Sequence, residues 1–174
     1  MPTIGVAIAI PEPWATQLQD YRAAVGDTTA PTIPTHITLV PPTEVADDGV
    51  AAIEEHLAAA AATVPAFDVH LRGTGTFRPV SPVVFVTVAI GISQCEQLAS
   101  AVRRGPLDVD LTFPYHPHVT VAHHLDDVRL DQAFDQLSDF ECEFTVGQFH
   151  LYVHEEDTGW RQTRSFDLLA ALGG

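Results

Sequence analysis

One short pattern of alternating polar and apolar residues occurs twice in this chain, once in each half. Residues 36–39 are His-Ile-Thr-Leu, and residues 118–121 are His-Val-Thr-Val. Because successive side chains of a β-strand point to opposite faces, each copy places a His and a Thr side by side and turns its apolar residues toward the interior. The pattern therefore predicts two similar half-buried strands, each presenting an imidazole next to a hydroxyl.

The same order of elements is predicted around both copies of the pattern. In the first half, hydrophobic periodicity indicates a strand, a helix, the motif strand, a second helix and a further strand, over residues 3–10, 14–25, 36–40, 45–62 and 67–72. The second half repeats this order and adds one strand, over residues 83–90, 93–104, 118–122, 126–137, 141–153 and 165–169.

Individual residues are expected to set the ends of these elements. Pro41-Pro42 should stop the first motif strand, because proline cannot donate a ladder hydrogen bond. Ser93 is the expected N-cap of its helix, with Glu96 completing a capping box. The Gly- and Pro-rich segment 73–82 is the expected crossing between lobes.

The duplicated order predicts an α+β fold with two similar lobes. We expect a pseudo-twofold axis between the lobes, antiparallel sheets flanked by helices, and an active-site cleft where the lobes meet. A chain of 174 residues with 46% hydrophobic content is long and apolar enough for one such bilobal domain over residues 1–174.

The charge of the chain argues against binding of long nucleic acid. The formal net charge is −15, and all eight basic residues are Arg. Such a surface should repel a duplex, because nucleic-acid binding rests mainly on neutralising phosphates. We expect a small nucleotide or an RNA end as the substrate, a monomeric protein and no membrane partner. The sequence shows no membrane-spanning run and no basic, signal-like N-terminus, so we expect a cytoplasmic location.

Two imidazoles and two hydroxyls around one small volume can cleave a phosphodiester without a metal. One imidazole accepts a proton and the other donates one, since an ordinary imidazole pKa of about 6.5 leaves both forms populated near neutrality. The hydroxyls of Thr38 and Thr120 would hold the phosphate oxygens as charge develops on them. His36 and His118 are therefore the candidate catalytic residues, with their roles as acid and base left open.

These motifs resemble those of the two-histidine phosphoesterase superfamily, in its bacterial 2′-5′ RNA ligase-like branch. The resemblance rests on Pro-Thr-His-Ile-Thr-Leu at 34–39 and Tyr-His-Pro-His-Val-Thr-Val-Ala at 115–122, and on their separation. The Gly-Thr-Phe turn at 75–77 before the strand at 83–86 is similar to the mid-chain crossover of the family. The resemblance implies hydrolysis of 2′,3′-cyclic phosphates or related ribose phosphodiesters, reversible 2′-5′ RNA joining in some members, and no cofactor.

One position departs from the family pattern. Many relatives carry Arg just after the Ala of the second motif, whereas this chain has His123. That difference bears on phosphate or ribose contacts at this edge of the site. Tyr115 and Arg78 are further candidate substrate contacts, with ordinary packing and solvation as their alternatives, and Trp160 is expected at the edge of the C-terminal core.

Two other classes of function remain open at this stage. His116 and His118 form a His-x-His pair on one strand face, which zinc or another divalent metal can use in a metal-binding module or metallohydrolase. No recognisable ligand spacing completes that set, and it leaves the repeated Thr unexplained. A non-catalytic binder of RNA ends or nucleotides would keep the fold and the site without turnover.

Overall fold

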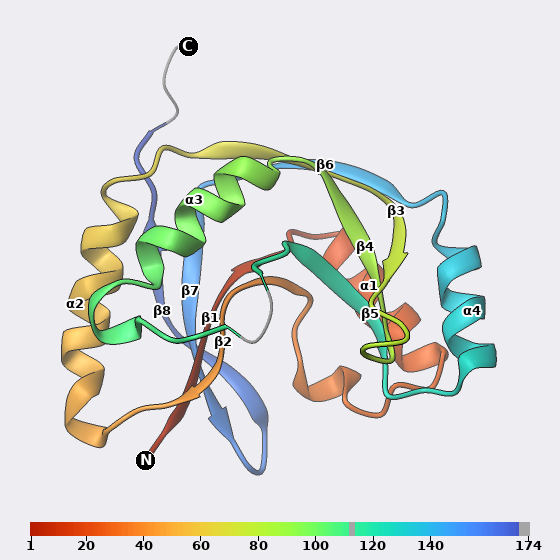
Figure 1. Cartoon of the computed structure of the whole chain (residues 1–174), viewed down its shortest axis with the longest axis horizontal. Helices are drawn as coiled ribbons and strands as arrows, with labels where there is room; N and C mark the ends of the chain where they lie inside the picture. Colours follow the sequence, from red (N-terminus) through yellow and green to blue (C-terminus); the bar gives the residue numbers. More distant parts are fainter. Residues whose placement is uncertain (112–113, 171–174) are drawn as a thin grey trace.

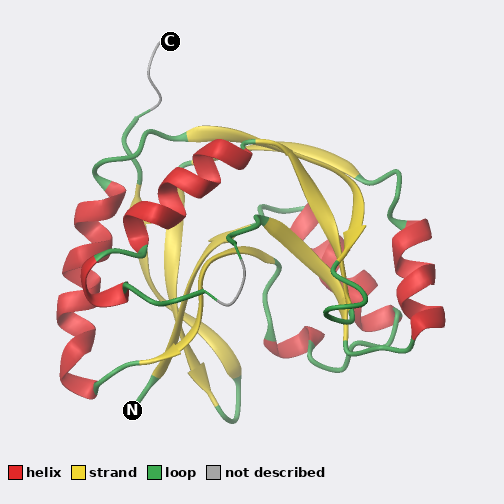
Figure 2. Ribbon diagram, in the orientation of Figure 1, coloured by secondary structure: helices red, strands yellow, loops and turns green. Residues whose placement is uncertain are grey.

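Two antiparallel four-stranded sheets form the framework of the protein in a computed structural model that describes residues 1–111 and 114–170 (Figures 1 and 2). The first sheet has the order β2-β1-β7-β8, formed by His36–Glu44, Thr3–Ala9, Gln148–Glu155 and Gly159–Asp167. The second has the order β5-β4-β3-β6, formed by His118–His123, Val83–Ile90, Phe67–Thr76 and Glu141–Val146. The predicted α+β fold with a pseudo-duplication is confirmed.

Helices cover both sheets. One helix from each half of the chain packs on the motif strand of the other half. The α-helices are α1 (Trp14–Ala24), α2 (Val50–Ala61), α3 (Ile92–Val102) and α4 (Asp127–Gln136). Short 3₁₀ turns span Ala30–Thr32, Asp47–Gly49 and Gly105–Leu107. In Figure 1, α2 and α3 lie beside the first sheet, whereas α1 and α4 lie beside the second. Helix α1 precedes β2 but packs on β5, and α3 precedes β5 but packs on β2, which draws the two motif strands together. None of the described helices is long and apolar enough to span a membrane.

The two motif strands occupy equivalent places and show the same burial. Each lies at the edge of its sheet, β2 beside β1 and β5 beside β4. The apolar members of the two motifs are fully buried, as predicted, and are Ile37, Leu39, Val119 and Val121. The His and Thr of each motif are only partly buried. Burial of the apolar face, worth roughly 1.5–3 kcal/mol per large side chain, thus fixes which way the polar pair points.

The first motif strand is longer than the sequence predicts. Strand β2 continues through Pro41-Pro42 to Glu44 instead of stopping at Val40. Its pairing with β1 shifts register between Ile4 and Val6, opposite the prolines. Because β2 is an edge strand, an irregularity at this point accommodates residues that cannot donate a ladder hydrogen bond.

The expected crossing between lobes at residues 73–82 is wrong. Strand β3 runs on to Thr76 and pairs with β4 as a hairpin within the second sheet. Gly73 has a φ of 74°, which a residue with a side chain rarely adopts, and the register of the ladder shifts between Leu71 and Thr74. The glycine therefore marks an irregularity in a continuous strand rather than its end.

The two lobes do not correspond to the two halves of the sequence. The strand expected over residues 141–153 divides at Gly147 into β6, which pairs with β3, and β7, which pairs with β1. Strand β8 spans Gly159–Asp167 rather than 165–169 and forms a hairpin with β7. The sequence did not predict its first part because the residues there are mostly polar and exposed. The chain thus crosses between sheets after β2 and again at Gly147.

Two predicted helix starts also differ. Ser93 does not cap α3, since the cap is Gly91 in a left-handed conformation with φ 104° and the helix begins at Ile92. The segment expected as a helix from Val45 becomes helical at Val50, after the short turn at 47–49. By contrast, Asp126 caps α4 by accepting a hydrogen bond from the Arg129 backbone N–H.

Candidate active site

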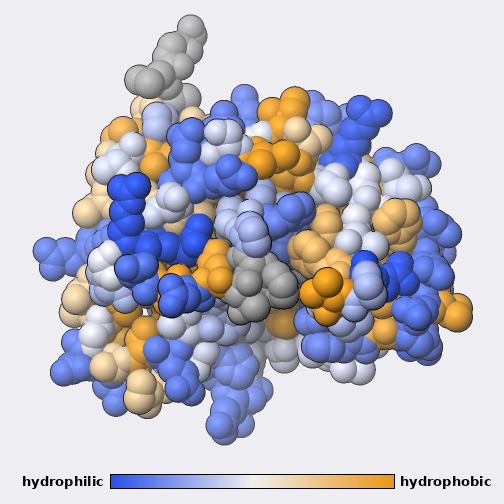
Figure 3. Space-filling model, viewed as in Figure 1, coloured by the Kyte–Doolittle hydropathy of each residue, from blue (hydrophilic) through white to orange (hydrophobic). Residues whose placement is uncertain are grey.

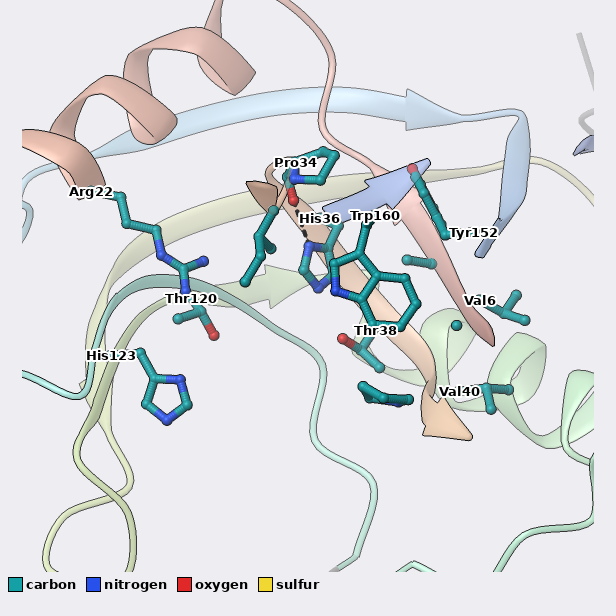
Figure 4. A pocket seen from close by; sticks show the side chains of 14 residues that line it. Val6, Arg22, Pro34, His36, Thr38, Val40, Thr120, His123, Tyr152 and Trp160 are labelled. Carbon is teal, nitrogen blue, oxygen red and sulfur yellow. Dashed lines mark hydrogen bonds between the residues drawn. The ribbon is translucent and has the colours of Figure 1, made fainter. Parts of the chain in front are cut away.

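The two motifs border two adjoining pockets, which we call the two compartments of one cavity. His36 lines the first compartment, which has a volume of about 280 Å³, and His118 lines the second, of about 610 Å³. Thr38, Thr120 and His123 line both compartments and so mark their junction. The structure thus brings the four motif side chains to a single site between the sheets. Figure 4 shows the first compartment from close by.

The two motif histidines are held in the same way. The ring Nδ1 of His36 lies 2.6 Å from the carbonyl oxygen of Pro34, and that of His118 lies 2.7 Å from the carbonyl oxygen of His116 (Figure 4 for His36). A carbonyl oxygen can only accept, so in each ring Nδ1 carries the proton and donates it. Nε2 is then the nitrogen with a free lone pair, and it has no hydrogen bond to the described residues. Each motif thus presents the same ring nitrogen for proton transfer.

The surroundings of both imidazoles favour their uncharged forms. Burial lowers the pKa of the His36 ring, and the positive charge of Arg22 lowers it further. Burial also lowers the pKa of His118, to about 4, with smaller contributions from His116 and His36. A negatively charged ligand between the rings would oppose both effects, because it favours the protonated form.

Aromatic side chains surround His118. The rings of Phe77 and Phe85 lie with their centroids 4.9 and 5.2 Å from the His118 ring. A side chain at Gly75 would place its Cβ 2.7 Å from the Phe85 ring, so the glycine makes room for that ring. This packing fixes the orientation of His118 and excludes water from one side of its ring.

Tyr115 joins the two motif strands. Its hydroxyl donates a 2.8 Å hydrogen bond to the backbone carbonyl of Thr38, while its ring borders the second compartment. The guanidinium of Arg103 lies over the ring, 5.4 Å from its centroid. The structure thus gives Tyr115 a bridging contact between the segment before β5 and strand β2.

Of the other residues singled out from the sequence, some line the cavity and others do not. His123 lines both compartments, and Trp160 borders the first rather than lying only at a core edge. Arg78 lines neither compartment, and its guanidinium pairs with Asp131 at 2.9 Å. His116 lines the second compartment, and its ring centroid lies 5.9 Å from that of His118.

Sequence reasoning missed Arg22, which lines the first compartment from α1. Its side chain is on the buried face of the helix, four residues after Leu18 and three before Val25, and the residue is only 5% exposed. A charged residue at helical spacing among apolar ones was the available signal.

Neither compartment contains a carboxylate among its described lining residues. This contrasts with the 23 acidic residues of the chain and with the largely hydrophilic face in Figure 3. Within residues 1–111 and 114–170, the one group of three side chains close enough to share a metal ion is His70, Glu141 and Glu143. His116 and His118 do not belong to that group, and the cavity is chemically suited to an anion.

The sequence matches the model of the 2′-5′ RNA ligase superfamily over residues 10–158. The chain belongs to this superfamily. The family expected from the two motifs is therefore confirmed, and membership indicates a phosphoesterase- or ligase-type enzyme. A Bacillus cytotoxicus protein provisionally named a phosphoesterase is 28% identical over 138 residues, covering 78% of this chain and 80% of that protein. A similarly named protein from Oceanobacillus iheyensis is 26% identical, covering 78% and 81% of the two chains.

Solved structures of other proteins show the same fold. Escherichia coli LigT in its apo form superposes with a TM-score of 0.71 at 20% identity, covering 97% of this chain and 99% of LigT. The protein TT0787 of Thermus thermophilus gives 0.71 at 21% identity, covering 98% and 99%. At these identities the likeness establishes the fold, and the chemistry has to be argued from the residues of this chain.

Proposed function

We propose that this protein is a metal-independent phosphodiesterase that hydrolyses 2′,3′-cyclic phosphate termini of RNA or related small ribose cyclic phosphodiesters. The observation that carries the proposal is the matched pair of histidines, each with Nδ1 bound to the carbonyl two residues earlier. Two Nε2 atoms are thereby available to one cavity, with a threonine hydroxyl two residues after each ring. This arrangement supplies one proton acceptor, one proton donor and two groups for phosphate oxygens.

The reaction we propose has one displacement at phosphorus. Nε2 of one histidine accepts a proton from water as the water oxygen bonds to phosphorus. The bond from phosphorus to one ribose oxygen breaks, and Nε2–H of the other, protonated histidine gives its proton to that oxygen. The product is a ribose phosphate monoester. Thr38 and Thr120 donate hydrogen bonds to the non-bridging oxygens, which gain charge in the transition state.

Substrate binding itself supplies the protonated histidine. Burial holds both imidazole pKa values below 6.5, so one ring has to gain a proton for the reaction. A phosphodiester anion placed at Thr38 and Thr120 favours the charged form of a nearby imidazole and raises its pKa. The cavity therefore acquires its acid when the substrate is present, and the second ring stays neutral as the base.

The two compartments give a reason to add 2′-5′ RNA ligase activity as a second proposal. They extend to either side of Thr38 and Thr120, so a phosphate at the junction would have space for an organic group on each side. Joining two RNA ends through a phosphodiester requires such space, whereas a nucleoside cyclic phosphate needs only one compartment. E. coli LigT, solved with 3′-AMP and with phosphate, shows that this fold holds such groups in a related protein.

Turnover of 2′,3′-cyclic nucleotides and of short RNAs ending in a cyclic phosphate tests the proposal. Phosphorus NMR follows conversion to a monoester and identifies which ribose oxygen is released. We expect hydrolysis by protein treated exhaustively with chelator, because the imidazoles supply the proton transfers that a metal-bound hydroxide would otherwise provide.

Two results would point to the other classes of function. Loss of activity in chelator with recovery on adding zinc would favour a metallohydrolase and would make the ligand roles of His116 and His118 the next question. Binding of cyclic nucleotides without turnover across this substrate set would favour a non-catalytic binder. Either result contradicts the proposed mechanism.

A further inference from the structure

Arg22 is a buried cation at the candidate active site, and some of its N–H donors have no partner among the described residues. It is 5% exposed, and it is the one Arg or Lys among the described residues that line the cavity. Its Nε donates a 2.6 Å hydrogen bond to Asp27 Oδ2, and its Nη2 donates a 3.4 Å hydrogen bond to Thr29 Oγ1. Nη1 has no hydrogen-bond partner in the described part of the chain, so at least this nitrogen is left to meet a ligand.

The side chain is held in place from behind, away from the cavity. Asp27 also accepts hydrogen bonds from the backbone N–H and the hydroxyl of Thr29, at 3.0 and 2.6 Å. Burial alone would raise the Asp27 pKa, but the hydrogen bonds from Thr29 and Arg22 outweigh it and the pKa is lowered. Asp27 does not line the cavity. The carboxylate therefore anchors one edge of the guanidinium and leaves the other edge facing the first compartment.

Arg22 lies beside the residues that we propose bind and cleave the phosphodiester. Figure 4 shows the guanidinium extending from α1 toward Thr120, with His36 and His123 bordering the same space. Its charge lowers the pKa of both His36 and His123, so it acts electrostatically on each of them. Since α1 packs on β5, the cation is placed at the second motif although it comes from the first repeat.

Burying a charge is costly, and hydrogen bonds from two of the five guanidinium N–H groups do not explain why a cation is buried here. An anion explains it, because a guanidinium offers two parallel N–H groups that match two phosphate oxygens. The absence of carboxylates among the described lining residues leaves that binding unopposed.

We infer that Arg22 is a phosphate-binding residue that holds the non-bridging oxygens of the reacting phosphate, with Asp27 and Thr29 as its positioning residues. This inference rests on the proposed function for the identity of the reacting phosphate. It assigns the cation of the site to a helix of the first half of the chain, at the edge of the cavity where β5 carries His123.

Binding of inorganic phosphate to the intact protein tests the role of Arg22 separately from turnover. Removing the guanidinium alone would leave Asp27 buried and unpaired, so the informative variant combines Arg22→Gln with Asp27→Asn. Asp27→Asn alone is the matched control that keeps the cation. Arg164→Gln removes an arginine that pairs with Glu54 outside the cavity. Calorimetric titration at several salt concentrations gives affinities, and thermal melts check folding.

We expect the double variant to bind phosphate roughly 10- to 100-fold more weakly than Asp27→Asn, as for loss of a charge-assisted hydrogen bond pair. Its binding should also depend less on salt, an effect that a purely structural role would not produce. Arg164→Gln should match the wild type. Equal phosphate affinity and equal salt dependence in the double variant and Asp27→Asn would overturn the inference, as would failure of the folded wild-type protein to bind phosphate.

Kinetics with a nucleoside 2′,3′-cyclic monophosphate then locate the bound phosphate. Because this substrate has a single phosphate, the double variant should lose kcat/KM relative to Asp27→Asn on it. A loss confined to substrates with a second phosphate would contradict the assignment to the reacting group. Arg22-dependent phosphate binding without turnover by the wild type would leave the anion site standing and refute the hydrolase.

Discussion

The two motif strands are alike at the backbone and unlike in their surroundings. In both β2 and β5 the His and Thr are partly buried, the residues between them are fully buried, and Nδ1 of the histidine binds the carbonyl two residues earlier. Arg22, Tyr152 and Trp160 line the cavity around His36. The ring of His118 instead packs against Phe77 and Phe85. The two motif strands thus share the same histidine geometry, whereas the surroundings of the two histidines differ.

This difference shows which properties the fold fixes and which it leaves free. The alternation of a strand and its hydrogen bond to the preceding carbonyl fix the ring nitrogen that each histidine presents. Residues from α1, β4, β7 and β8, and Phe77 directly after β3, determine the charge and shape around it. Under the proposed function, a symmetric pair of histidines therefore serves an asymmetric substrate, with an anionic part near Arg22 and an apolar part near Phe77.

The largest effect should come from removing either histidine. His36→Ala and His118→Ala should each lower turnover of a 2′,3′-cyclic phosphate by roughly 10²–10⁴-fold, the usual contribution of a general acid or base. The double variant should lose much less than the product of the two, because residues that act as one unit are not additive. Steady-state kinetics with thermal melts as the folding control measure this. A normally folded His118→Ala protein with wild-type turnover would break the equivalence of the two strands.

Replacing the threonines should have a smaller effect, and a similar one on both strands. Thr38→Val and Thr120→Val keep the β-branched shape and remove one hydroxyl each, so we expect losses in kcat of up to about 10²-fold, the lower range for one oxyanion donor. Val at these positions controls for strand packing. A large loss for one threonine and none for the other would show that the phosphate is held from one side.

Tyr115→Phe tests how much the contact between β2 and the segment before β5 contributes to stability and to turnover. The variant leaves the Thr38 carbonyl without its 2.8 Å hydrogen bond, and we expect a decrease of about 1 kcal/mol in the free energy of unfolding. Turnover should fall by less than in the threonine variants. Denaturant unfolding and kinetics measure the two effects, and an unchanged stability would mean that water replaces the bond without cost.

The last effect concerns stability alone and is a pH dependence that His118 contributes. The pKa of His118 is lowered to about 4 in the folded protein, so the unfolded chain binds this proton more readily between pH 4 and 6.5. The stabilisation is complete above pH 6.5 and is lost as the pH falls toward 4. His118→Gln should therefore lose less stability than the wild type on acidification from pH 7 to 4.5.

The matched control for this measurement is His154→Gln, at an exposed position of β7 outside the cavity. It should keep the wild-type pH dependence. If His118→Gln and the wild type lose stability equally over this range, the His118 ring is better solvated than its packing against Phe77 and Phe85 implies.

The sequence was sufficient for the fold class and for bringing the motifs together, because both rest on local periodicity. Alternation buried Ile37 and Val119 and turned the histidines the other way, and the repeated order of elements indicated the pseudo-duplication. The roles of His36, His118, Thr38 and Thr120 stay predictions until the variants are measured.

What the sequence did not reveal depends on long-range packing. Pro41-Pro42 reads as the end of a strand unless β2 is known to lie at a sheet edge. The division at Gly147 follows from which sheet each segment joins, which no local pattern encodes. Arg22 was missed because its place beside Thr120 depends on α1 crossing to the other repeat.

The pH dependence of kcat/KM for a 2′,3′-cyclic nucleotide, in chelator, tests most directly whether two imidazoles exchange protons at one site. Because burial lowers the pKa of both rings in the free protein, the account predicts a bell-shaped profile with its maximum below pH 6.5. Its two limbs belong to the coupled pair, and the maximum of kcat lies at higher pH because the bound anion raises the pKa values. A kcat/KM that has no acidic optimum and rises to a plateau above pH 8 would contradict the account.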